Sequence, residues 1–189
     1  MANILTGARI FLVLPFIFAF TANAAWNMKA ALAIYVIAAA TDFLDGYVAR
    51  ARNDVTPLGR ALDPIADKLL ITAALILLVR NGVLHGVESL AAILLILREV
   101  FVSGLREALA GKAAQLPVTG LAKAKTTMQM IAGGLLLAAT PTGLLGDDWR
   151  ALALASFWLA VALTIWTGVQ YALRAIAMLN SAPADDGTA

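Results

Sequence analysis

Four aspartates stand inside or beside strongly apolar stretches of this sequence. Asp42 and Asp45 are three residues apart, and Asp63 and Asp67 are four apart. On a helix, either spacing puts both side chains on one face, about one turn apart. Because an acidic side chain at membrane depth is costly, it usually marks a functional site. These four residues are therefore the first candidates for chemistry.

The two aspartate pairs are expected on antiparallel helices joined by a short turn around residues 53–57. In a symmetric hairpin, Asp42 and Asp67 lie at the same depth, with Asp45 and Asp63 nearer the turn. At a rise of about 1.5 Å per residue, the deeper pair would lie about 12 Å inside the end of the hairpin. All four carboxylates can then converge on one point.

Four converging carboxylates repel one another and need a compensating charge. The sequence has no cysteine, and an all-oxygen site suits hard cations such as Mg²⁺ or Mn²⁺. A divalent metal held there could bind a diphosphate. The alternative is that the aspartates form ion pairs with Arg50, Arg60 or Lys68 and only fix the helix register.

Small and basic residues beside the first aspartate pair suit a phosphate-containing ligand. Gly46 and Ala49 leave room for a ligand against the backbone, although small residues are also ordinary packing devices in membrane helices. Arg50 offers a planar fork of donors to phosphate oxygens. The single histidine, His85, lies in a short polar break, and we interpret it as incidental.

The composition is that of a membrane protein. Of 189 residues, 61% are hydrophobic and 14% charged, whereas charged residues make up about a quarter of a soluble domain. The net charge of +2 is too small to indicate a nucleic-acid partner. We therefore expect membrane lipids around the chain and no nucleic acid.

Six apolar segments of about the length that crosses a bilayer can be laid out between short polar breaks. The prediction is an all-α, polytopic membrane protein, a bundle of six transmembrane helices forming a single domain over residues 1–180, with a polar tail over residues 181–189. A cleaved signal peptide is an alternative for the first segment. The segments are Ile4–Ala22, Met28–Arg50, Arg60–Val79, Ser89–Leu109, Gly120–Thr140 and Trp149–Ala177.

The distribution of lysine and arginine near the segment ends predicts the orientation. One side receives Arg9, Arg50, Arg52, Arg60, Arg106, Lys112, Lys123, Lys125 and Arg174, and the other receives Lys29, Arg80 and Arg150. Because basic residues favour the cytoplasmic side, both termini and the loops after the second and fourth segments are expected there. The aspartates then face the cytoplasmic half.

Eight positions over 26 residues match one signature. Asp42, Asp45, Gly46, Ala49, Arg50, Gly59, Asp63 and Asp67 resemble the pattern D-x2-D-G-x2-A-R-x8-G-x3-D-x3-D of the CDP-alcohol phosphotransferase family. The resemblance implies six transmembrane helices, usually in a homodimer, and phosphoryl transfer from a CDP-linked donor to an alcohol. It implies that the four aspartates hold Mg²⁺ or Mn²⁺, that Asp67 is also the general base, and that Asp42, Gly46, Ala49, Arg50 and Gly59 bind the CDP donor.

Further stretches are similar to bacterial, inner-membrane members of the family that make phosphatidylglycerophosphate from CDP-diacylglycerol and glycerol 3-phosphate. They are NILTGAR, DPIADKLL, LREVFVSGLREALAG and AKAKTTMQMIAGG. A phosphorylated acceptor needs cationic partners, and Arg98, Arg106, Lys123 and Lys125 could build that phosphate site. The alternatives are that Arg98 forms an ion pair and that the other three attract anionic headgroups or set topology.

The first apolar segment carries a second polar face. Asn3, Thr6 and Arg9 recur at helical spacing and are candidate contacts to either substrate. Within the family, the acceptor could instead be phosphatidylglycerol, serine or inositol phosphate. An ion or proton transporter would spread polar residues across both membrane faces, and a purely structural membrane subunit would need no carboxylate cluster.

Overall fold

The computed structural model describes residues 2–22, 24–52, 57–109 and 120–181. For residues 2–6, 8–9, 42–52, 57–64, 67, 122–123 and 179–181 it describes the backbone alone.

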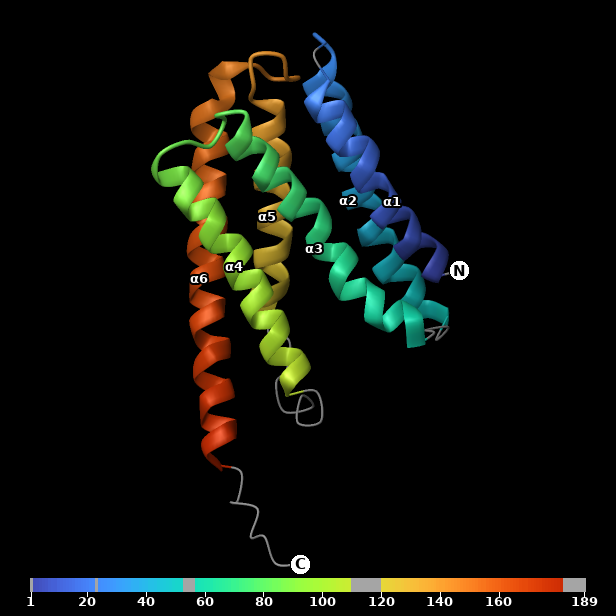
Figure 1. The fold of residues 1–189 in the computed structure, drawn as a ribbon, viewed down its shortest axis with the longest axis vertical. Helices are drawn as coiled ribbons and strands as arrows, with labels where there is room; N and C mark the ends of the chain where they lie inside the picture. The colour runs from blue at the N-terminus through green and yellow to red at the C-terminus, as the bar shows by residue number, and fades with distance from the viewer. Residues whose placement is uncertain (1, 23, 53–56, 110–119, 182–189) are drawn as a thin grey trace, which may run out of the picture.

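The described chain is all helical, as the apolar segments predict (Figure 1). No predicted segment end differs from the observed helix end by more than four residues, and the largest difference is at the end of the last helix, where Ala177 was expected and Ser181 is found. The six α-helices are α1 (Ala2–Thr21), α2 (Asn27–Arg52), α3 (Pro57–Arg80), α4 (Val87–Ala108), α5 (Gly120–Ala138) and α6 (Arg150–Ser181), with a 3₁₀ turn, η2 (Asp147–Trp149), before α6.

Successive helices alternate in direction. In Figure 1, α1, α3 and α5 begin at the lower end of the bundle, where α2, α4 and α6 end. The second half of α2 and the first half of α3 therefore lie toward the same end as the close of α4 and the start of α5.

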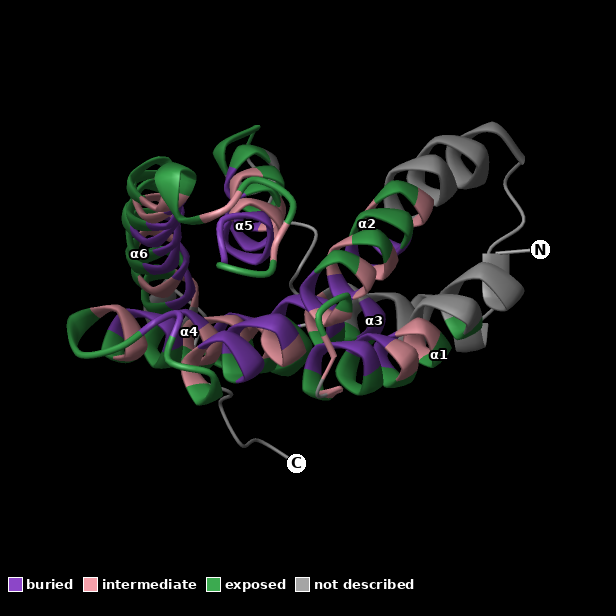
Figure 2. Cartoon of the chain, turned by 90° about the horizontal axis from the view of Figure 1, so that it is seen from above, coloured by how far each residue is buried: buried purple, intermediate pink, exposed green. Residues whose placement is uncertain are grey.

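Helix α1 packs on α2 and α3, α5 packs on α2, α3 and α6, and α4 packs on α3 and α6. Figure 2 shows the buried surfaces turned inward along these contacts and the exposed surfaces turned outward. The fully buried side chains of Phe16 and Phe20 make α1 part of the core.

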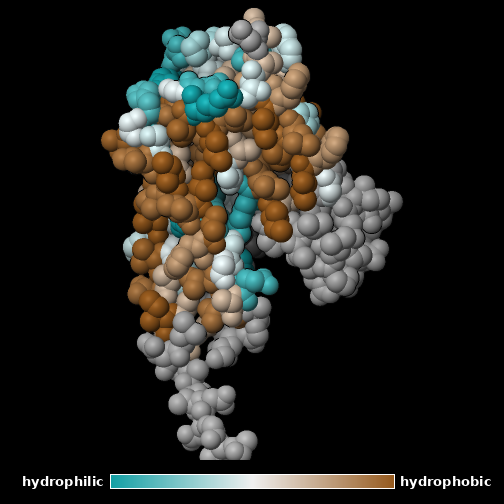
Figure 3. Space-filling view, viewed as in Figure 1, coloured by the Kyte–Doolittle hydropathy of each residue, from teal (hydrophilic) through white to brown (hydrophobic). Residues whose placement is uncertain are grey.

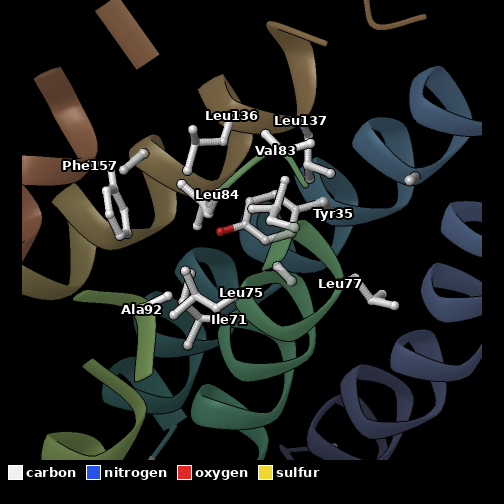
Figure 4. Close-up of a cluster of buried hydrophobic side chains, with 14 of the residues drawn as sticks. Tyr35, Ile71, Leu75, Leu77, Val83, Leu84, Ala92, Leu136, Leu137 and Phe157 are labelled. Atoms are coloured by element: carbon white, nitrogen blue, oxygen red, sulfur yellow. The ribbon is translucent and has the colours of Figure 1, made fainter. Parts of the chain in front are cut away.

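Tyr35 of α2 lies at the centre of the core and is 1% exposed. Its ring is surrounded by side chains that include Leu84, Leu136 and Leu137 (Figure 4). The hydroxyl donates a hydrogen bond to the backbone oxygen of Met130 on α5, at 3.2 Å, which satisfies the one polar atom of a buried phenol.

The turns at the upper end of the bundle are fixed by hydrogen bonds between distant residues. Arg150 at the start of α6 donates to the backbone oxygen of Val83 in the α3–α4 turn, at 3.0 Å. Thr142 after α5 donates to the side-chain oxygen of Asn27 at the start of α2, at 3.3 Å. The α3–α4 turn is tight because Gly82 has a positive φ of 70°, which costs glycine little.

Much of the outer surface is apolar. Figure 3 shows hydrophobic residues over most of the described part of the visible face, with hydrophilic residues gathered at the upper end and a few more between the helices farther down. Large apolar side chains are exposed along α1, α4 and α6, among them Phe11, Phe18, Leu97, Phe101, Trp166 and Leu173. Soluble monomers rarely expose apolar patches of more than a few hundred Å².

One described helical stretch, Asp147–Met178, is long and apolar enough to cross a membrane. Ile10–Thr21 and Asn27–Thr41 are shorter apolar helices. The sequence predicted six crossings, and within the described residues one helix meets this standard.

Replacing Gly133 should disturb the contact between α5 and Tyr35. A Cβ atom at Gly133 would lie 2.5 Å from the Tyr35 hydroxyl, whereas at Gly134 the nearest atom, in the Tyr35 ring, is at 3.7 Å. Because overpacking forces side chains and backbone to move, Gly133→Ala should lower the free energy of unfolding in detergent by about 1–3 kcal/mol relative to Gly134→Ala. Equal stability of the two variants would contradict this account.

Candidate functional site

The four aspartates lie on the helices that the sequence predicted. Asp42 and Asp45 are in the second half of α2, and Asp63 and Asp67 are in the first half of α3. Their side chains lie outside the described residues, so their convergence and their metal stay a prediction. The same holds for the side-chain contacts of the expected donor site at Gly46, Ala49, Arg50 and Gly59.

Several basic and polar candidates also lie outside the described side chains. Asn3, Thr6 and Arg9 are on α1 and Lys123 is on α5, each with its backbone in a helix. Among the side chains that are described, no three histidine, aspartate or glutamate residues gather to hold a metal ion. The aspartates of the predicted site are not part of that set.

The structure brings two of the predicted cations, Arg98 of α4 and Lys125 of α5, onto a single carboxylate. Arg98 Nη1 donates to Glu99 Oε1 at 2.9 Å, and the Lys125 ammonium donates to the same oxygen. The three side chains are 11%, 12% and 6% exposed for Arg98, Glu99 and Lys125. We call these three residues the cation cluster.

Helix α6 holds the arginine from the other side. Arg98 Nη2 donates to Thr167 Oγ1 at 2.9 Å, while the Thr167 hydroxyl donates to the backbone oxygen of Leu163 at 2.8 Å. Thr164, about one turn earlier, is used in the same way: it accepts a hydrogen bond from Gln129 of α5 at 3.1 Å. Both threonines therefore link a neighbouring helix to α6.

A close approach of α6 leaves one donor of Arg98 without a partner. Gly168 lies so near that a Cβ atom there would be 3.1 Å from both Cγ and Nε of the arginine. Nε is buried and has no hydrogen-bond partner among the described residues. An unsatisfied buried donor is costly, so this position favours an additional acceptor.

The cation cluster is connected to the helix that carries the second aspartate pair. Lys68, the residue after Asp67, donates to the Ser103 hydroxyl on α4. Ser103 in turn donates to the backbone oxygen of Glu99, at 2.7 Å. Lys68 also lies near enough to Lys125 for their charges to interact. The polar groups of α3, α4 and α5 thus form one continuous region inside the bundle.

Arg106, the remaining predicted cation with a described side chain, lies apart from this cluster. It is eight residues after Arg98 on α4, which corresponds to about 12 Å along a helix. Its side chain is exposed, and the guanidinium carbon lies 5.8 Å from the centre of the Tyr171 ring on α6. This is the geometry of a cation–π contact.

Reasoning from sequence missed the roles of Glu99 and Thr167. Glu99 stands beside Arg98 in an apolar segment. A charged residue in such a segment usually has a function or a partner, so the sequence did carry a signal for Glu99. Thr167 gave no such signal because threonine is common in membrane helices and usually bonds to its own backbone. Within the described side chains, the cation cluster carries one more positive than negative charge, which suits an anionic group.

Comparison with known proteins relates most of the chain to one family. The sequence model of the CDP-alcohol phosphatidyltransferase family matches residues 1–166. The chain is 41% identical over 172 residues to a protein of Rickettsia felis, covering 90% of this chain and 92% of that protein. It is 40% identical over 178 residues to a protein of Pseudomonas fluorescens, covering 92% and 88%. Both relatives are named CDP-diacylglycerol–glycerol-3-phosphate 3-phosphatidyltransferase.

Replacing Gly168 should displace Arg98. Because a methyl group would press on the arginine at Cγ and Nε, Gly168→Ala should have a free energy of unfolding about 1 kcal/mol lower than that of Gly104→Ala. Gly104→Ala on α4, where no atom lies within 4 Å of the added carbon, is the control. Thermal unfolding in detergent measures both, and a Gly168→Ala variant as stable as Gly104→Ala would refute the tight contact.

Proposed function

The chain belongs to the CDP-alcohol phosphatidyltransferase family, and we propose that it transfers a phosphatidyl group from CDP-diacylglycerol to glycerol 3-phosphate. The products are phosphatidylglycerophosphate and CMP, which makes the protein an enzyme of phospholipid biosynthesis. The observation that carries this proposal is the identity of about 40% over roughly nine-tenths of the chain to relatives named for this reaction.

The proposed reaction needs a divalent metal, and the donor set suits one. Asp42, Asp45, Asp63 and Asp67 would hold Mg²⁺ or Mn²⁺, because four carboxylates offer only hard oxygen ligands. A metal bound there would neutralise the diphosphate and the departing CMP. Their positions on the two antiparallel helices α2 and α3, toward one end of the bundle, support this assignment.

Asp67 is the proposed general base. A hydroxyl oxygen of glycerol 3-phosphate forms a bond to the phosphorus of the phosphatidyl group, and the bond from that phosphorus to CMP breaks. The hydroxyl proton passes to the Asp67 carboxylate. Gly46, Ala49, Arg50 and Gly59, with Asp42, would line the site of the CDP group, as the family signature implies.

The cation cluster supports a phosphate site for the acceptor. Arg98 and Lys125 are held together in a buried region, and the Lys68–Ser103 link connects that region to α3. Arg106 and Lys123 would guide the anion inward from the same end of the bundle. Asn3, Thr6 and Arg9 of α1 remain proposed substrate contacts on sequence grounds alone.

We further propose that all six helices cross the bacterial inner membrane and that the reaction faces the cytoplasm. The alternating helix directions and the exposed apolar side chains support a bilayer location, and the lysine and arginine distribution supports the orientation. A homodimer is proposed from the family resemblance.

Purified protein should release CMP from CDP-diacylglycerol when glycerol 3-phosphate is supplied. Phosphatidylglycerol, serine and inositol phosphate are the competing acceptors of the same family and should give little product. A chelator should abolish turnover, and Mg²⁺ or Mn²⁺ should restore it, because uncompensated carboxylates would repel the diphosphate. Turnover with only one of the other acceptors would show that glycerol 3-phosphate is not the acceptor. Turnover that resists the chelator would refute the requirement for a divalent metal.

Asp67→Asn should reduce kcat by about 100-fold or more, since a general base contributes about 10²–10⁴-fold to a rate. The variant should stay folded in detergent, as judged by thermal unfolding and gel filtration. Asp148→Asn, which neutralises an exposed aspartate in η2 at the other end of the bundle, should keep full activity. Normal turnover by Asp67→Asn would overturn the role of this residue as base.

A further inference from the structure

We propose that Glu99 is a positioning residue that holds Arg98 and Lys125 as a matched pair for the phosphate of the acceptor. This inference rests on the proposed function, because it concerns the acceptor of that reaction. Glu99 itself would not contact the phosphate, since two anions repel each other. Its effect is transmitted through the two cations.

The geometry of the shared oxygen fixes the separation of the cations. Nη1 of Arg98 and the ammonium of Lys125 both donate to Oε1 of Glu99. Two donors within hydrogen-bond distance of one oxygen lie on the order of 5 Å apart or closer. This separation lets them bind two different oxygens of one phosphate group. Without the carboxylate, the two positive side chains would repel each other and separate.

The surroundings limit where each cation can move. Arg98 is fixed at its far end by Thr167, and Gly168 lies so close that even a Cβ atom there would be 3.1 Å from Cγ and Nε of the arginine. The backbone of Glu99 is tied to Ser103, which Lys68 contacts from α3. Glu99 is therefore the one described group that joins the cation of α4 to the cation of α5.

The charge of the cation cluster also favours an anion. Two cations and one carboxylate carry a net charge of +1, and Arg98 Nε is a buried donor with no partner among the described residues. One carboxylate balances one cation, but Glu99 is shared by two cations, so the cluster keeps one positive charge that Glu99 does not balance. The additional cation and the unused donor together match a doubly charged phosphate better than a neutral acceptor.

The test is a comparison of Glu99→Gln, which keeps the length but removes the charge, with Glu107→Gln, an exposed glutamate two turns later on α4. Glu99→Gln should raise the KM for glycerol 3-phosphate about tenfold and leave the KM for CDP-diacylglycerol within about twofold. Glu107→Gln should change neither. Unchanged KM values, or equal increases for both substrates, would overturn the positioning role while leaving the proposed function intact.

A binding measurement without turnover separates the two proposals. Glycerol 3-phosphate alone should raise the unfolding temperature of the wild-type protein and of Glu107→Gln, and this increase should be lost in Glu99→Gln. If Glu99→Gln does not fold, Glu99→Asp takes its place, because it keeps the charge on a shorter side chain. Glycerol 3-phosphate should then raise the unfolding temperature of Glu99→Asp less than it raises that of the wild-type protein.

The wild-type protein decides which proposal fails. If it releases no CMP with glycerol 3-phosphate, the proposed function is wrong. In that case, thermal stabilisation by inorganic phosphate that depends on Glu99 would still support a positioned pair of cations. Absence of stabilisation by either anion would overturn that pair as a phosphate site.

Discussion

The sharing of one Glu99 oxygen by Arg98 and Lys125 is the interaction on which the second half of the bundle depends. Charged groups are expensive to remove from water, and breaking a buried ion pair by removing one partner costs about 3–5 kcal/mol. With Thr167 holding the arginine from α6, the side chains of α4, α5 and α6 must assemble together before all of these polar contacts are made. The positions of these helices are therefore set by charge pairing as well as by apolar packing.

The two halves of the bundle carry complementary chemistry. Helices α2 and α3 carry the four aspartates of the family signature, and α4 and α5 carry the cations of the proposed acceptor site. The hydrogen bond from Lys68 to Ser103 connects the two halves, and Lys68 directly follows Asp67, the proposed base. In this arrangement, CDP-diacylglycerol would bind at the metal site of α2 and α3, and glycerol 3-phosphate would bind beside it at the cations of α4 and α5.

Long apolar runs made the helices predictable, because most of the breaks between them contain glycine, proline or charged residues. Side-chain partners were not predictable in the same way. Lys125 is 26 residues from Glu99, and Tyr35 is 95 residues from Met130, so no local spacing reports either contact. Arg98 and Arg106 lie about two turns apart on α4, and α6 offers Thr167 to the first and Tyr171 to the second. Charged residues, Arg98 and Glu99 among them, also interrupt the apolar run of α4, which does not meet the standard for a membrane-crossing helix that α6 meets.

The hydrogen bonds at the upper end of the bundle also bear on how the protein is made. Val83 receives its hydrogen bond from a residue 67 positions later in the chain, and Asn27 receives one from a residue 115 positions later. A ribosome delivers Thr142 only after the first five helices have been synthesised, and Arg150 only as α6 begins. Asn27 must therefore rely on water or the insertion machinery for this bond until α5 is complete, and Val83 must do so until α6 begins.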